Sequence, residues 1–85
     1  MGLNDMIPKP PDVVTIVSER NPLNPKSPRT IVEVTIIGEA GKCERFLRSS
    51  EPYQTAAKGL IRSGFDKICE QNSDIYGVTI FSRDL

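Results

Sequence analysis

Cys43 and Cys69 carry the most reactive side chains in this 85-residue chain, which has no histidine and no tryptophan. Without histidine, the commonest general base and the commonest metal ligand are missing. The two cysteines are far apart and outside any Cys-x-x-Cys pair, so they do not predict a zinc site. The sequence therefore predicts a protein that is not an enzyme, with no catalytic residues, no metal and no cofactor.

Both cysteines fall at positions that we expect to face the core. A free thiol packs there as a small apolar side chain. Two cysteines are too few for a scaffold held together by disulfides. We therefore expect the protein in the cytoplasm, where thiols stay reduced.

Eleven basic and eleven acidic residues cancel, so the net charge gives no general attraction to nucleic acid or to an anionic membrane. No apolar run approaches the length of about 18–20 residues that crosses a membrane. The length predicts a single domain with a thin core. Residues 1–12, with three prolines and no apolar period, are expected to form a flexible N-terminal arm. Residues 13–85 then form the domain.

One apolar stripe predicts a helix that begins after Ser49 or Ser50 and runs to about Gln71. Gly64 lies on this stripe. It indicates either a close approach of the helix to the sheet or a break in the helix. The positions of the stripe recur at i, i+3, i+4 and i+7, and they are Tyr53, Ala56, Ala57, Leu60, Ile61, Gly64, Phe65, Ile68 and Cys69.

Short apolar runs predict four strands, at residues 13–17, 30–37, 42–48 and 75–82. Residues 18–28 hold three prolines at a three-residue spacing and are expected to form an extended, exposed loop. The predicted fold is α+β, a four-stranded mainly antiparallel sheet with one helix packed on one face, in the order β-β-β-α-β. The last strand would run parallel to the third through a right-handed crossover.

The turn at residues 38–41 sets a register that pairs Ile37 with Lys42 and separates two faces of the predicted sheet. The face toward the helix collects Val32, Val34, Ile36, Cys43 and Leu47. In the last strand Tyr76, Val78 and Ile80 share one face and Ile75, Thr79 and Phe81 the other, and Ile75 and Phe81 join the outer face if the first set faces the helix. The outer face then carries more large apolar side chains than a solvated sheet face usually does. Its candidate binding residues are Ile31, Glu33, Ile37, Lys42, Glu44, Phe46 and Arg48.

This outer face predicts a small cytoplasmic protein-interaction module: an inhibitor, an adaptor or an accessory subunit. Its partner is another protein, or a second copy in a homodimer that forms through the sheet. Two alternatives would account for the apolar face without a partner. The register could be shifted by one residue, or the N-terminal arm could fold over the face.

An alternative function is RNA or DNA binding. The stretch from Val32 to Gly38, followed by a turn and a helix that bears Ala56-Ala57, resembles the later part of a double-stranded-RNA-binding domain over about half the chain. The resemblance implies a nucleic-acid partner for Arg45, Arg48 and Lys58. The family's first helix and its Lys-Lys-x-Ala-Lys cluster have no counterpart here, so its phosphate-contacting residues do not transfer.

Overall fold

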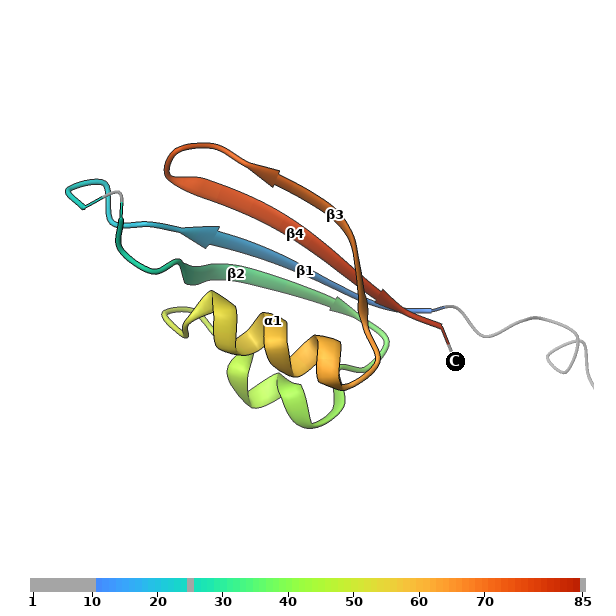
Figure 1. Cartoon of the computed structure of the whole chain (residues 1–85). Helices are drawn as coiled ribbons and strands as arrows, with labels where there is room; N and C mark the ends of the chain where they lie inside the picture. Colours follow the sequence, from blue (N-terminus) through green and yellow to red (C-terminus); the bar gives the residue numbers. More distant parts are fainter. Residues whose placement is uncertain (1–10, 25, 85) are drawn as a thin grey trace, which may run out of the picture.

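The computed structural model describes residues 11–24 and 26–84. Within them the chain forms a four-stranded antiparallel sheet with helices packed on one face, and the predicted α+β class is confirmed (Figure 1). The strands are β1 (Asp12–Glu19), β2 (Thr30–Ile37), β3 (Asp66–Asn72) and β4 (Tyr76–Arg83). The helices are the 3₁₀ helix η2 (Gly41–Phe46) and α1 (Tyr53–Arg62).

The strand order across the sheet is β2-β1-β4-β3, and every neighbouring pair is antiparallel. The sheet therefore consists of two hairpins, β1–β2 and β3–β4, joined through their inner strands. Between the hairpins the chain crosses from one edge of the sheet to the other through η2 and α1 (Figure 1). The final strand thus lies inside the sheet between antiparallel neighbours, and the expected parallel pairing with a third strand is wrong.

The strand expected over residues 42–48 is wrong, because this segment forms η2 and a short turn after it. Cys43 and Leu47 are buried and Phe46 is half-buried, all on the helical side of the sheet. Their spacing of i, i+3 and i+4 is that of a helix surface. The alternation of Cys43, Arg45 and Leu47 also fits a strand, so the segment carries both patterns and packing selects the helical one.

The predicted helix also ends earlier than expected, at Arg62 rather than near Gln71. Gly64 breaks it, with φ = 95°. The amide of Gly64 donates to the carbonyl of Ile61 (3.1 Å) and that of Phe65 to the carbonyl of Leu60 (3.0 Å). This is a Schellman motif, in which a left-handed residue ends the helix and the residues at Leu60 and Phe65 pack together. The chain continues as β3, so Cys69, expected in the core, is exposed.

The first and last strands of the chain, β1 and β4, begin close to their predicted positions. β1 begins at Asp12, which is buried, so this residue belongs to the sheet and not to the arm. The rest of the predicted arm, apart from Pro11, lies outside the described residues. The strand predicted at residues 75–82 is β4, displaced by one residue. Among the described residues, no helix is long and apolar enough to cross a membrane.

The core lies between the sheet and the two helices. From the predicted stripe, α1 contributes Tyr53, Ala56 and Leu60, which are buried, and Phe65 joins them from the turn after the helix. The sheet contributes Val14, Ile16, Ile31 and Phe81. One polar contact fixes the start of α1, because the hydroxyl of Tyr53 donates to Oγ1 of Thr79 (3.0 Å) inside the core. The first half of the stripe is therefore confirmed as the core-facing side of a helix.

Candidate protein-binding surface

The two faces of the sheet are separated by the alternation of side chains along β1. Asp12, Val14, Ile16 and Ser18 are buried under the helices, while the residues between them are half-buried on the other side. Both helices lie on the same side of the sheet (Figure 1). We call the opposite side the open face.

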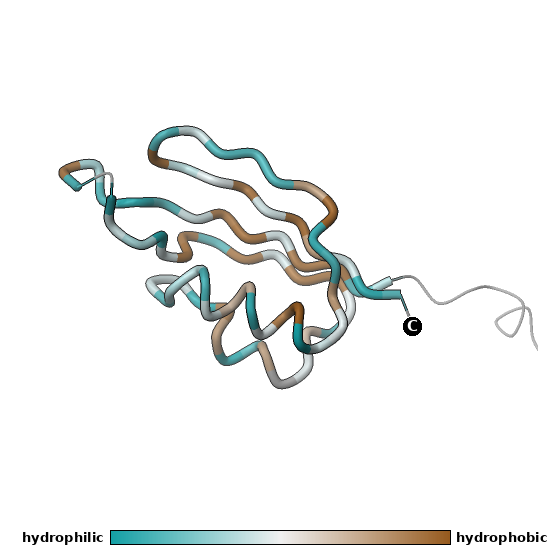
Figure 2. Tube along the Cα trace, in the orientation of Figure 1, coloured by the Kyte–Doolittle hydropathy of each residue, from teal (hydrophilic) through white to brown (hydrophobic). Residues whose placement is uncertain are grey.

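The pairing of the strands assigns each residue to a face. The open face comprises Val13, Thr15, Val17 and Glu19 of β1, Glu33, Thr35 and Ile37 of β2, Asp66, Cys69 and Gln71 of β3, and Tyr76, Val78, Ile80 and Ser82 of β4. Figure 2 shows that hydrophobic residues follow the central strands, whereas β3 is mostly hydrophilic.

Large apolar side chains on the open face are strongly exposed. The exposed fraction is 58% for Ile37, 54% for Tyr76 and 39% for Val78. On β3 a bulge between Lys67 and Cys69 leaves Ile68 without a paired residue on β4, so the pairing assigns this 61% exposed side chain to neither face. Single exposed apolar residues are common, but several large ones on one sheet face are typical of a contact surface.

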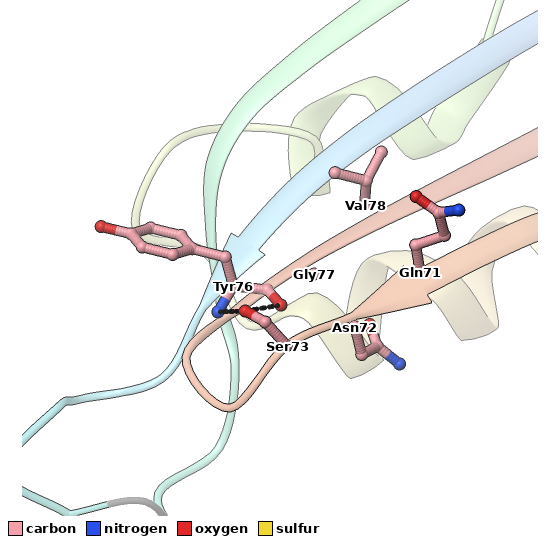
Figure 3. A pocket seen from close by; sticks show the side chains of 6 residues that line it. All are labelled: Gln71, Asn72, Ser73, Tyr76, Gly77 and Val78. Atoms are coloured by element: carbon pink, nitrogen blue, oxygen red, sulfur yellow. Dashed lines mark hydrogen bonds between the residues drawn. The ribbon is translucent and has the colours of Figure 1, made fainter.

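The open face is hollowed at the end of the β3–β4 hairpin. A hollow of about 480 Å³ is bordered there by Gln71, Tyr76 and Val78, among other residues. Figure 3 shows Gln71 and Val78 on the same side of the hairpin, with Asn72 pointing the opposite way. The turn is held by the hydroxyl of Ser73, which donates to the carbonyl of Tyr76 and accepts from its amide, both at 3.1 Å. The hollow is therefore a shallow depression on a well-ordered turn.

The charges on the open face all have the same sign. Glu19 and Glu33 lie near one end of the face and Asp66 near the other, as their pairing with Tyr76, Val17 and Ser82 indicates. None of the paired positions of this face among the described residues carries a lysine or an arginine. The open face thus has an apolar centre and an acidic border.

Two of the seven residues predicted to bind a partner lie on the open face. Glu33 is exposed opposite Val17, and Ile37 is exposed opposite Val13. The placement of Ile31 is a correction, because this residue is only 2% exposed and packs in the core. A bulge in the β1–β2 pairing places Ile31 opposite the buried Ser18, which reverses the side expected for Ile31, and it leaves Val32 unpaired and exposed.

The other four predicted binding residues lie on the opposite side of the sheet. Lys42, Glu44 and Phe46 belong to η2, and Arg48 follows it. Phe46 packs against the core cluster, and the guanidinium of Arg45 lies 4.8 Å from the centre of its ring. The strand pairing that would put these residues on the outer face does not form. Of the four charged candidates, Glu33, Lys42, Glu44 and Arg48, only Glu33 therefore lies on the open face.

The two faces of β4, which the sequence pattern leaves open, are assigned by its pairing with β1. Tyr76, Val78 and Ile80 lie on the open face, and Phe81 is buried beneath α1. The alternation in the sequence separates these two sets, but both contain large apolar residues, so hydropathy alone does not say which set faces the helix. The set that faces the core also contains the polar Thr79, which is buried and bonded to Tyr53, so its hydropathy does not mark it as the buried set.

No family model matches this chain, and neither the curated proteins nor the solved structures contain a match. The resemblance to a double-stranded-RNA-binding domain loses its basis, because only β1 and β2 precede α1, and two further strands follow it. Among the described residues, no three histidine, cysteine or acidic side chains gather in a way that could hold a metal ion.

Proposed function

We propose that this protein is an interaction module that binds another protein through the open face of its sheet. The observation that carries the proposal is the set of large apolar side chains on the face that no helix of the described residues covers. Ile37 on β2 and Tyr76 and Val78 on β4 are exposed there, and Val13, Val17 and Ile80 are half-buried between them. Burial of such side chains in a complex is favourable by about 25 cal/mol per Å² of apolar surface removed from water. The surface is rigid, because it is made of paired strands, so little ordering cost opposes binding.

The acidic border indicates the chemistry of the partner. Glu19, Glu33 and Asp66 would lie at the edge of the contact, where charges orient a partner and increase the association rate. A partner with apolar side chains flanked by lysine or arginine complements this surface. Two copies of the chain stacked through their open faces would bring acidic borders together, so a different protein fits better than a homodimer.

We propose the cytoplasm as the site of this binding. Both cysteines are free thiols, and Cys69 is exposed on the open face. An exposed thiol persists where glutathione keeps it reduced. Burial of the open face in a complex would also cover Cys69, which makes this residue a natural reporter.

The test compares acidic substitutions on opposite sides of the sheet in the full chain. Ile37→Asp and Val78→Asp should abolish co-purification of the partner. Ile61→Asp, which replaces a 52% exposed apolar residue on α1, should retain it. Far-ultraviolet circular dichroism should be the same for all three variants.

The position of the contact is tested with iodoacetamide. The co-purified partner should slow alkylation of Cys69 in the native protein. A partner retained equally by Ile37→Asp and Val78→Asp, or alkylation at an unchanged rate in the complex, would contradict the proposal. A doubled solution mass of the isolated chain, lost in Val78→Asp, would instead identify a homodimer.

A further inference from the structure

The loop between β1 and β2 is folded back on itself by its own polar side chains. The amide of Leu23 donates to Oδ1 of Asn21 (2.9 Å), that of Lys26 to Oδ1 of Asn24 (3.3 Å), and that of Asn21 to Oγ of Ser27 (3.0 Å). Such bonds are typical of asparagine- and serine-rich turns. The expected extended loop is therefore a closed turn, which brings its two ends and their basic residues together.

These basic residues line a pocket of about 430 Å³ on the helical side of the sheet. Arg20, Lys26 and Arg29 come from the loop, and Gln54 of α1 and Asn72 and Glu70 of β3 lie across from them. Three positive side chains therefore share the pocket with a single carboxylate. The carboxylate of Glu70 also lies 3.5 Å from Nζ of Lys67, which offsets its charge further.

Arg29 is held in place at the floor of the pocket. Its Nη1 donates to Oδ1 of Asn72 (2.8 Å), and its carbonyl accepts the amide of Tyr53 (3.0 Å). The absence of a side chain at Gly77 makes room for this pair, because a Cβ there would collide with Oδ1 of Asn72 and lie 2.9 Å from Nη1 of Arg29. The position of the Arg29–Asn72 pair in the pocket thus depends on the glycine at position 77 of β4.

One buried polar group lies close to the Arg29–Asn72 pair. The hydroxyl of Ser18 is fully buried without a hydrogen-bond partner, 3.3 Å from the Cβ position over Gly77, but it does not line the pocket. A buried hydroxyl normally has a partner. Tyr53 and Gln54 of the first turn of α1 form one wall of the pocket, and the amide of Tyr53 is bonded to the carbonyl of Arg29.

We propose that this pocket binds the phosphate group of a small, hydroxyl-bearing phosphate monoester. A dianionic phosphate suits the guanidinium of Arg29 and the ammonium of Lys26, since guanidinium binds phosphate oxygens in pairs. The volume lies within the range of small-molecule sites, about 300–1,000 Å³, and leaves room beside the phosphate. There Glu70 offers an acceptor to a hydroxyl of the ligand. The pocket lies on the side of the sheet away from the open face, so this proposal does not rest on the proposed function.

The experiment is calorimetric titration of the full chain with ribose 5-phosphate, inorganic phosphate and ribose. Ribose 5-phosphate should bind with saturation, inorganic phosphate more weakly, and ribose not at all. No saturable binding of ribose 5-phosphate up to about 10 mM, which corresponds to about −3 kcal/mol, would overturn the proposal. Equal binding of ribose and ribose 5-phosphate would overturn it as well, because the phosphate would then not be recognised. Equal affinity for ribose 5-phosphate and inorganic phosphate would contradict a site for a phosphate monoester, because the sugar would then add nothing to binding.

Variants locate the site. Arg29→Gln and Lys26→Gln should each weaken binding of ribose 5-phosphate about tenfold or more, as expected for loss of a charge-assisted hydrogen bond. Arg62→Gln removes an exposed charge at the other end of α1, about 15 Å away, and should leave binding unchanged. Equal weakening by Arg62→Gln and Arg29→Gln would mean general charge attraction, and would contradict the site.

Gly77→Ala tests the built floor without removing any charge. The added methyl group should displace the flexible ends of Arg29 and Asn72 and weaken ribose 5-phosphate binding, while the circular dichroism spectrum stays the same. This variant also keeps the proposal testable if Arg29→Gln does not fold. Wild-type affinity in Gly77→Ala would contradict the role of the Arg29–Asn72 pair.

Discussion

Arg83 of β4 and Asp12 of β1 form a largely buried ion pair, with Nη2 and Oδ2 2.8 Å apart and the side chain of Asp12 only 3% exposed. The pair connects more than two strands. Nη1 of Arg83 donates to the carbonyl of Ser63 (3.0 Å), and Oδ1 of Asp12 accepts the amide of Glu39 (3.1 Å). The guanidinium also lies 4.4 Å from the centre of the Phe65 ring. One pair thus ties the central strands to the end of α1 and to the turn after β2.

Arg83→Met should lower the free energy of unfolding by about 3 kcal/mol, because it removes the guanidinium that lies 2.8 Å from the buried carboxylate of Asp12. Urea denaturation followed by circular dichroism measures the change. Lys67→Met is the matched control, since it removes the exposed pair with Glu70 and should change stability by less than about 1 kcal/mol. Similar losses in the two variants would contradict a special role for the buried pair.

Tyr53→Phe should destabilise the protein by about 1–2 kcal/mol, because Oγ1 of the fully buried Thr79 loses its hydrogen-bond donor. The control is Tyr76→Phe, which removes the hydroxyl of a half-exposed side chain on the open face and should have almost no effect. Thermal melts of both variants under the same conditions make the comparison. An unchanged melting temperature for Tyr53→Phe would show that the hydroxyl does not anchor α1.

Replacing either of two glycines near the end of α1 by alanine should change the free energy of unfolding, and the two changes should have opposite signs. Gly64→Ala should cost about 1–2 kcal/mol, because φ = 95° is a left-handed conformation that alanine adopts with difficulty. Gly59→Ala should stabilise by up to about 1 kcal/mol through helix propensity, since its Cβ would meet only Sγ of Cys43 at 3.4 Å. Chemical denaturation measures both. A stabilising Gly64→Ala would contradict the Schellman motif.

The fold class could be predicted from the sequence, but the positions of two elements could not. The stripe from Tyr53 to Leu60 is unambiguous, because it is amphipathic and its buried members are confirmed. Beyond Gly64 the residues Phe65, Ile68 and Cys69 continue the helical period by coincidence, although the left-handed glycine ends the helix. A glycine on an apolar stripe fits both a close contact and a break, and only the packing of Phe65 decides between them.

The candidate binding surface could be predicted only in part. An apolar outer face followed from one helix covering one side of a sheet, and Glu33 and Ile37 do lie on it. The remaining residues depended on pairings between distant segments. Because the paired residues of β1 and β4 are 57 to 71 positions apart in the sequence, no local pattern indicates that Val78 faces outward. The proposed phosphate pocket could not be predicted for the same reason, since its walls come from the loop, α1 and β3.

The strand order has a consequence for how the chain folds as it is made. The centre of the sheet is formed by β1 and β4, whose residues Asp12 and Arg83 are 71 positions apart. During synthesis the β1–β2 hairpin can form early, but its inner edge has no neighbour until β4 has left the ribosome. Pairings between such distant segments close large loops and slow folding. A nascent chain without β4 therefore has a hairpin and a helix but lacks the strand that joins the two halves of the sheet. During this interval the apolar residues of β1 are most exposed, and a chaperone would have its largest effect.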